Sequence, residues 1–129
     1  MPDSTFATAI NCMDGRTQLP VIEYLKRRYG VAYVDMITEP GPNKILAEHT
    51  DSAIVADIRK CVTISVKRHN SKVVAVVGHH DCAGNPASGE EQKRQIQAAL
   101  DTVESWNLGV ELVGLWVDER WQVQAVQHK

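Results

Sequence analysis

The sequence lacks an excess of charge of either sign. Fourteen Lys and Arg side chains stand against sixteen Asp and Glu side chains, which leaves a formal charge of −2 at pH 7. Proteins that hold nucleic acid or anionic membranes by surface charge carry a clear basic excess. The balance therefore gives no electrostatic reason to expect either partner, whereas a small neutral or anionic substrate is compatible with it.

The sequence also lacks a long hydrophobic run. No segment approaches the ~18 consecutive apolar residues that a membrane-spanning helix needs. Residues 1–12 have neither the basic start nor the apolar stretch of a secretory signal, so we expect a cytoplasmic protein. With no internal repeat or long linker in 129 residues, we expect one domain over residues 1–129, large enough to bury a core without disulfides.

Cysteines are few, and their number is odd: Cys12, Cys61 and Cys82. An odd number in a cytoplasmic chain argues against a disulfide framework and favours thiol or metal chemistry. Cys61 falls within a stripe of apolar residues at helical spacing, which predicts a small buried side chain. The cysteine phosphatases are excluded because their arginine, six residues after the cysteine, is replaced by Gln18 or Ser88.

What the sequence does contain is an alternation of apolar and amphipathic segments. Apolar runs predict strands over residues 7–11, 31–37, 72–78 and 111–117, and an alternating run predicts an antiparallel edge strand over 121–126. Helices are expected over residues 20–29, 44–48, 52–69 and 90–107. The first of them has Pro20 in its first turn and ends at Gly30, and the third has Thr50 or Asp51 as its cap. The expected fold class is α/β, with a mainly parallel four-stranded sheet flanked by helices and a fifth, antiparallel edge strand.

Two motifs follow two of the predicted strands. CMDGR, residues 12–16, follows the first, and GHHDCAG, residues 78–84, overlaps the end of the valine-rich third. Ligands bind at the carboxyl ends of strands in an open parallel sheet, so the motifs converge if these strands are neighbours. Two thiolates and one imidazole suit zinc, and an open fourth position is typical of a catalytic site. The spacing favours a zinc site; ordinary buried cysteines are the alternative.

CMDGR and GHHDC together resemble the beta-class carbonic anhydrases, whose pattern is C-x-D-x-R followed by H-x-x-C. The similarity extends to VVAVVGHHDC and ELVGLWVDERWQV and covers roughly residues 7–120. It implies a short member of that family in which Cys12, His79 and Cys82 bind zinc, and it selects His79 over the adjacent His80. Asp14 and Arg16 would form a dyad beside the metal, or Asp14 would close the fourth zinc position in a resting form.

The resemblance implies an enzyme that hydrates carbon dioxide to bicarbonate by zinc-bound hydroxide. Asp14 would accept a hydrogen bond from that hydroxide, and Arg16 would keep Asp14 ionised through a bidentate pair. Hydrolysis of carbonyl sulfide or carbon disulfide on the same scaffold is an alternative, and so is a non-catalytic zinc-binding homologue. The resemblance also implies a homodimer or a higher homo-oligomer.

The sequence departs from the family pattern in three places. Eleven residues precede Cys12, where family members usually have N-terminal helices. TEPGPNK, residues 38–44, replaces a common arginine–asparagine–alanine–glycine stretch, and CAGNP, residues 82–86, replaces Cys-Gly-Gly. We expect Gly84 to allow a tight backbone path past the metal or to form an ordinary turn, and Asp81 to cap a turn or to orient a ligand. His49 and His80 could relay protons or have no specific role. Trp106, Trp116 and Trp121 are expected in core or dimer contacts.

Overall fold

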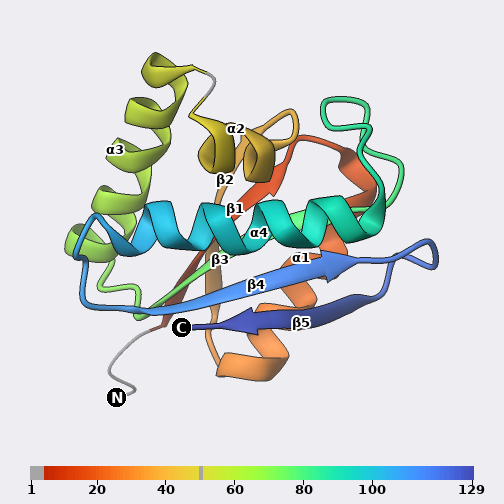
Figure 1. Cartoon of the computed structure of the whole chain (residues 1–129). Coiled ribbons are helices and arrows are strands. Elements are labelled where there is room, and N and C mark those ends of the chain that lie inside the picture. Colours follow the sequence, from red (N-terminus) through yellow and green to blue (C-terminus); the bar gives the residue numbers. More distant parts are fainter. Residues whose placement is uncertain (1–4, 50) are drawn as a thin grey trace.

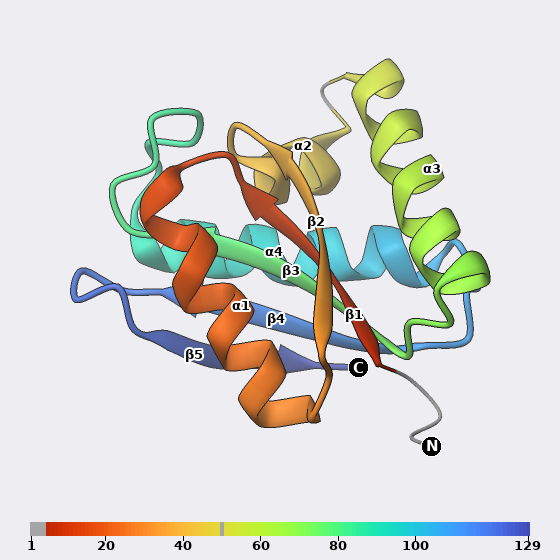
Figure 2. The same ribbon diagram turned by 180° about the vertical axis from the view of Figure 1, so that it is seen from behind.

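The fold is an α/β sandwich, seen in a computed structural model that describes residues 5–49 and 51–129. The elements are β1 (Phe6–Cys12), α1 (Gly15–Tyr29), β2 (Tyr33–Glu39), α2 (Pro42–Glu48), α3 (Ser52–Arg68), β3 (Val73–His79), α4 (Gly89–Glu104), β4 (Glu111–Val117) and β5 (Val123–His128). The sheet has the order β2-β1-β3-β4-β5, and only the β4–β5 pair is antiparallel. Helix α1 covers one face of the sheet, and α2, α3 and α4 lie on the other (Figures 1 and 2). The predicted fold class is confirmed.

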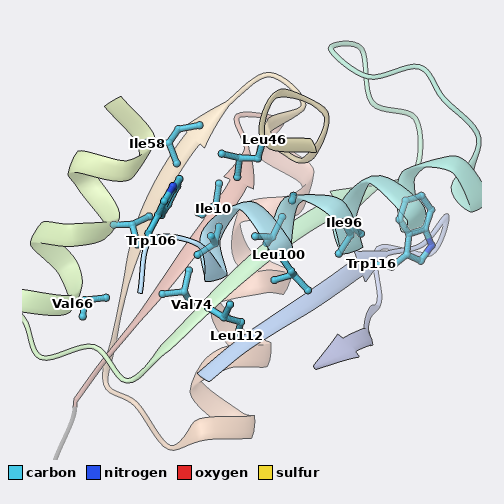
Figure 3. Close-up of a cluster of buried hydrophobic side chains, with 14 residues drawn as sticks. Ile10, Leu46, Ile58, Val66, Val74, Ile96, Leu100, Trp106, Leu112 and Trp116 are labelled. Carbon is cyan, nitrogen blue, oxygen red and sulfur yellow. The ribbon is translucent and has the colours of Figure 1, made fainter. Parts of the chain in front are cut away.

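An apolar layer on each face of the sheet explains the valine-rich strand. Every residue of β3 is buried. Val74 packs into the cluster beneath α2, α3 and α4, and Ala75 packs into the cluster beneath α1. Figure 3 shows Ile96 and Leu100 of α4 lying over the sheet in the first of these clusters. Burial on both faces is the environment that a near-continuous apolar run predicts for a central parallel strand.

Helix α1 begins earlier than predicted. It starts at Gly15, so Pro20 lies inside the helix rather than in its first turn. The start is set by Asp14, whose Oδ1 accepts a hydrogen bond from the backbone N–H of Arg16 at 2.9 Å. Pro20 cannot donate the helical hydrogen bond at its position, and α1 nevertheless continues through it to Tyr29. With this start, the first motif itself forms the cap and first turn of α1, while Gly30 ends the helix as expected, with φ of 68°.

The other boundaries differ from the prediction by a few residues. Strand β4 coincides with its predicted range, β2 begins and ends two residues later, α2 begins two residues earlier, and α4 ends three residues earlier. Asp51 caps α3 by accepting hydrogen bonds from the N–H groups of Ala53 and Ile54, both at 3.1 Å. Thr50, the other predicted cap, lies outside the described residues. No helix in the described ranges is long and apolar enough to cross a bilayer.

The prediction for Cys61 is wrong, because this side chain is exposed. Helix α3 packs near one edge of the sheet, where it contacts β1 and β2 (Figure 2). Its buried stripe is therefore narrow and runs through Ile58 and Val62. Cys61 falls on the flank of that stripe, where it lines a cleft between α3 and β2.

A tight turn joins β4 to the antiparallel strand β5. Oδ1 of Asp118 accepts hydrogen bonds from the backbone N–H groups of Arg120 and Gln122, at 2.9 and 3.0 Å. Strand β5 begins at Val123, two residues after the predicted start. Trp121 therefore belongs to the turn rather than to the strand, and its φ is 60°.

Candidate metal centre

The carboxyl ends of β1 and β3 bring the two motifs together. These strands pair in parallel, so Cys12 and His79 end adjacent strands, and Cys82 follows in the loop after β3. The Sγ atoms of Cys12 and Cys82 lie 3.8 Å apart. One ligand atom from each of the three residues lies within 4.8 Å of the other two, and all three residues are buried. The structure thus assembles the three predicted side chains at one point.

The imidazole of His79 is oriented by a backbone contact. Its Nδ1 donates a hydrogen bond to the carbonyl oxygen of His80 at 2.7 Å. The other ring nitrogen, Nε2, is buried and has no hydrogen-bond partner within the described part of the chain. A histidine held through Nδ1–H presents the lone pair of Nε2, which is the arrangement of a metal ligand with its ring fixed from behind. The imidazole of His80, by contrast, belongs to an exposed residue outside the cluster.

The two thiols share an environment that favours one negative charge. A hydrogen bond from the Cys82 thiol holds the pKa of Cys12 far below its usual range, while the same contact raises the pKa of Cys82. The backbone N–H groups of Gly41 and Asp14 lower the pKa of Cys12 further. One sulfur is therefore stabilised as a thiolate. The second sulfur loses its proton readily only if a cation takes the place of that proton.

These donors fit zinc. Two sulfurs and one imidazole nitrogen match the ligand types of tetrahedral zinc sites, and thiolates disfavour magnesium and calcium. The unpartnered Nε2 of His79 is the atom that such an ion would satisfy. The cluster of Cys12, His79 and Cys82 is therefore compatible with a metal ion.

Asp14 and Arg16 form an ion pair beside this cluster. Nη2 of Arg16 donates to Oδ2 of Asp14 at 2.6 Å, and Nε of Arg16 donates to Oδ1 of Asp14 at 3.0 Å. This bidentate pairing lowers the pKa of Asp14 to about 2. Arg16 also reaches the ligand loop, where it donates to Oδ2 of Asp81 at 3.3 Å and to the Asp81 carbonyl at 3.2 Å. Arg16 thus connects the two motifs, and the structure pairs Asp81 with Arg16.

Trp121, expected in the core or a dimer contact, is partly buried against the apolar cluster beneath α1, and sequence reasoning missed only its contact with Arg16. The indole lies against the guanidinium of Arg16, with Cζ 4.4 Å from the ring centroid. The rings of His79 and His80 each lie 6.3 Å from it. Trp121 follows β4, whose carboxyl end lies at the same edge of the sheet as the two motifs (Figure 1). That place in the chain is the signal that could have identified it.

Buried amides behind the cluster were missed as well. Oε1 of Gln92 accepts from the backbone N–H of His79 at 3.2 Å, and Nε2 of Gln92 donates to the His79 carbonyl at 3.0 Å. Asn85 donates to Gln95 at 2.6 Å and to Asn43 at 3.4 Å. Glutamines within the inward-facing stripe of a predicted helix could have signalled this network, because buried amides require partners.

The TEPGPNK and CAGNP segments, both departures from the family pattern, pack against each other. A Cβ built at Gly84 would lie 2.7 Å from Cβ of Pro40, and one at Gly41 would lie 2.8 Å from Cβ of Asn85. Gly84 therefore permits a close backbone approach to Pro40. The tight path past a metal that was expected of Gly84 stays a prediction. Gly41 also has a φ of 60°. Two glycines thus allow the loop after β2 to close over the loop that carries Cys82.

The fold and the cluster define a class of α/β protein that gathers two thiols and an imidazole at the carboxyl edge of a parallel sheet. A family model described as "Putative carbonic anhydrase" matches residues 2–127. The chain belongs to this carbonic anhydrase family. No curated protein matches the sequence.

Solved structures of beta-class carbonic anhydrases share the fold. The carbonic anhydrase of Streptococcus mutans superposes with a TM-score of 0.64 at 16% identity, covering 98% of this chain and 83% of that one. Isoform I of the beta-carbonic anhydrase of Trichomonas vaginalis superposes with a TM-score of 0.63 at 15% sequence identity, covering 98% of this chain and 84% of that one. The apo form of a carbon disulfide hydrolase superposes with a TM-score of 0.57 at 14% sequence identity, covering 95% of this chain and 78% of that one. At such identities these similarities establish the beta-class fold alone.

Proposed function

We propose that the protein is a zinc-dependent carbonic anhydrase that hydrates carbon dioxide to bicarbonate. The observation that carries the proposal is the buried group of Cys12, His79 and Cys82, whose ligand atoms lie within 4.8 Å of one another in a carbonic anhydrase fold. Its immediate neighbour is the ion pair of Asp14 and Arg16. This combination supplies a place for a metal ion and a charged hydrogen-bonding group next to it.

In the proposed enzyme, Cys12, His79 and Cys82 hold the zinc ion. Bound zinc supplies a Lewis acid that lowers the pKa of water toward neutrality. The chain contributes a fixed imidazole, since Nδ1 of His79 is already committed to the His80 carbonyl. It also contributes a thiol pair whose second proton is lost when the ion arrives.

Asp14 is proposed to orient the attacking water. Its pKa of about 2 means that the carboxylate is ionised throughout the neutral range, so it accepts hydrogen bonds and donates none. Arg16 occupies both carboxylate oxygens from one side and is itself bound to Asp81. The carboxylate therefore keeps one orientation. Since Oδ1 also accepts the backbone N–H of Arg16, the lone pair left for water is on Oδ2.

The proposal is tested by measuring zinc content and carbon dioxide hydration on the same purified sample. We expect about one zinc per chain and a stopped-flow hydration rate that disappears in a Cys82→Ser variant. The Cys61→Ser variant is the matched control because Cys61 is exposed and lies outside the cluster. Stoichiometric zinc without any hydration activity would eliminate the proposed reaction while preserving the metal site.

Carbon disulfide or carbonyl sulfide hydrolysis is the second candidate. A carbon disulfide hydrolase shares the fold of this chain. Carbon disulfide, carbonyl sulfide and carbon dioxide are all linear heterocumulenes with an electrophilic carbon, so the same activated water can attack each of them. Release of hydrogen sulfide from carbon disulfide or carbonyl sulfide by the zinc-loaded protein, at a higher kcat/KM than for carbon dioxide hydration, would select this reading.

We also propose that the protein is a homodimer or a higher homo-oligomer. The sheet edge formed by β2 has no neighbouring strand in the described chain. Large apolar side chains are exposed at Tyr33 on that edge and at Ile64 on α3, with exposed fractions of 60% and 47%. Sedimentation equilibrium decides the matter, and a monomer at micromolar concentration would remove this part of the proposal.

The proposed location is the cytoplasm. All three cysteines are free, and both Cys12 and Cys82 must remain reduced to bind a metal ion. A reducing compartment provides that condition. Fractionation of the cells that produce the protein tests the location, and recovery outside the cytoplasm would contradict it.

A further inference from the structure

Trp121 has a backbone conformation that its side chain does not favour. Its φ of 60° lies in the left-handed region, where a bulky residue is an outlier and glycine or asparagine is usual. The turn closes through backbone groups and one carboxylate. The N–H of Trp121 donates to the Asp118 carbonyl at 2.9 Å, and the N–H of Asp118 donates to the Gln122 carbonyl at 3.0 Å. None of these bonds uses the indole, so the turn gives no reason for tryptophan at this position.

The indole has a different partner, the guanidinium of Arg16. Cζ of Arg16 lies 4.4 Å from the ring centroid, which is a close cation–π contact. The ring also packs at the margin of the apolar cluster beneath α1. It lines a cleft of about 450 Å³ together with Leu19 and Tyr24 of α1. The tryptophan therefore joins the β4–β5 turn to the first turns of α1, where the motif residues lie.

The bond from Arg16 to Asp81 is the one that needs support. The exposed fractions of these two side chains are 47% and 70%, whereas that of Asp14, the bidentate partner, is 19%. Ion pairs between exposed side chains are weak because water and salt screen the charges and the side chains move. A planar guanidinium that rests on an indole keeps its fork of N–H donors in one orientation. The contact thus restricts the residue that connects the two motifs.

We propose that Trp121 is a positioning residue whose indole fixes the guanidinium of Arg16 in the orientation that binds Asp14 and Asp81. The role is exerted through Arg16, and the indole makes no contact with the reacting atoms in this account. The link to catalysis depends on the proposed carbonic anhydrase function, whereas the effect on the order of the Arg16 side chain does not. The two can therefore be tested separately.

The decisive variant is Trp121→Gly, because glycine suits the left-handed φ and removes the indole together with its Cβ. If Trp121 served the turn alone, replacing it with glycine would leave the Arg16 signals and the activity unchanged and would not weaken the turn. Trp121→Tyr restores an aromatic face at the same position. Asn107→Gly is the matched control, since Asn107 also has a positive φ, of 54°, and lies in the exposed loop after α4.

The primary measurement is an NMR spectrum of the zinc-loaded protein. In the native protein, we expect the side-chain δ protons of Arg16 to be shifted upfield by the indole ring current and its Nε–H to exchange slowly. In Trp121→Gly, both signatures should be lost while the zinc content is unchanged. A lower unfolding temperature is expected there, because the ring no longer packs against the cluster beneath α1. We expect kcat for carbon dioxide hydration to fall about 2- to 5-fold, the range of an exposed cation–π contact, and Trp121→Tyr to restore most of it.

Several results would overturn the proposal. These are Arg16 protons without an upfield shift in the native protein, Arg16 signals unchanged by Trp121→Gly, or a loss of kcat that also appears in Asn107→Gly. If the zinc-loaded native protein hydrates no carbon dioxide, the proposed function fails, and the NMR signals of Arg16 still decide whether Trp121 orients it.

Discussion

The side-chain amide of Gln92 binds both peptide groups of His79. Oε1 accepts the backbone N–H at 3.2 Å, and Nε2 donates to the carbonyl oxygen at 3.0 Å. A Cβ at Gly78, the preceding residue, would lie 3.0 Å from Oε1 of Gln92, so only glycine leaves room for this close approach. The end of β3 is therefore held by a side chain from α4, at the residue proposed to ligate the metal.

Replacing Gln92 with leucine should weaken metal binding as well as the fold. The change leaves the buried N–H and carbonyl of His79 without partners, at a cost of about 1–3 kcal/mol of unfolding free energy. Metal affinity should fall by roughly 10- to 100-fold, as it does when support for a ligand is removed. Denaturant unfolding and competition with a zinc chelator measure the two effects. Gln97→Leu, on the exposed face of the same helix, should change neither; equal losses in both variants would contradict this assignment.

Removing a metal ligand should uncouple folding from zinc. In a Cys12→Ser variant, we expect loss of bound zinc and an unfolding temperature that no longer depends on added zinc. At a free zinc concentration a thousand times the dissociation constant, binding contributes about 4 kcal/mol to the native protein. Differential scanning calorimetry with and without chelator measures this zinc-dependent shift of the unfolding temperature. Cys61→Ser should keep the full shift, and loss of the shift in Cys61→Ser would contradict the assignment of Cys12, His79 and Cys82 as the ligands.

Asp14→Asn separates the helix cap from the proposed chemistry. Asparagine is as good an N-cap as aspartate, so α1 should keep its start at Gly15, and the protein should lose only the stabilisation that comes from the ion pair of Asp14 with Arg16. It should also retain zinc, since Asp14 is absent from the cluster. Turnover should fall by at least about 100-fold, because a neutral amide replaces the acceptor carboxylate. Full hydration activity in this variant would refute the role given to Asp14 and Arg16.

Tyr29 should make the stability of the protein fall at alkaline pH. Burial, followed by the nearby carboxylate of Glu111, raises the pKa of Tyr29 to about 12. The unfolded value is about 10, so the folded state holds this proton more tightly, and stability is lost as pH rises from about 10 to about 12. Tyr29→Phe has no proton to lose. Its denaturation midpoint should therefore decline less than that of the native protein between about pH 10 and about pH 12, and parallel declines would contradict the assignment.

The sequence was sufficient to predict the fold and the convergence of Cys12 with His79 and Cys82. Apolar runs set the strands, and parallel strands place their carboxyl ends at one edge, so the two motifs converge on the condition that their strands are neighbours. The choice of His79 over His80 came from the resemblance to the beta-class carbonic anhydrases. The ranges expected for β3 and β4 deviate from the structure by at most one residue. The contacts that surround the three side chains depend on which faces of distant elements meet, and no spacing in the chain encodes that.

The errors have individual physical causes. Pro20 suggested a helix start, but Asp14 provides a cap six residues before it, so the helix starts at Gly15. The stripe of α3 suggested burial for Cys61, but α3 crosses only the edge of the sheet, so its flank faces solvent. Trp121 resembled a core residue by composition. Its place beside Arg16 follows from a turn with an unusual φ, which no propensity predicts.

X-ray absorption at the zinc edge of the purified protein tests the central claim most directly. We expect about one zinc per chain, bound by two sulfur atoms and one imidazole nitrogen, with a fourth light-atom ligand. The Zn–S distances should be about 2.3 Å, and the spectrum of Cys82→Ser should lose one sulfur or the metal altogether. A protein without stoichiometric metal, or a zinc spectrum with oxygen and nitrogen ligands only, would contradict the account.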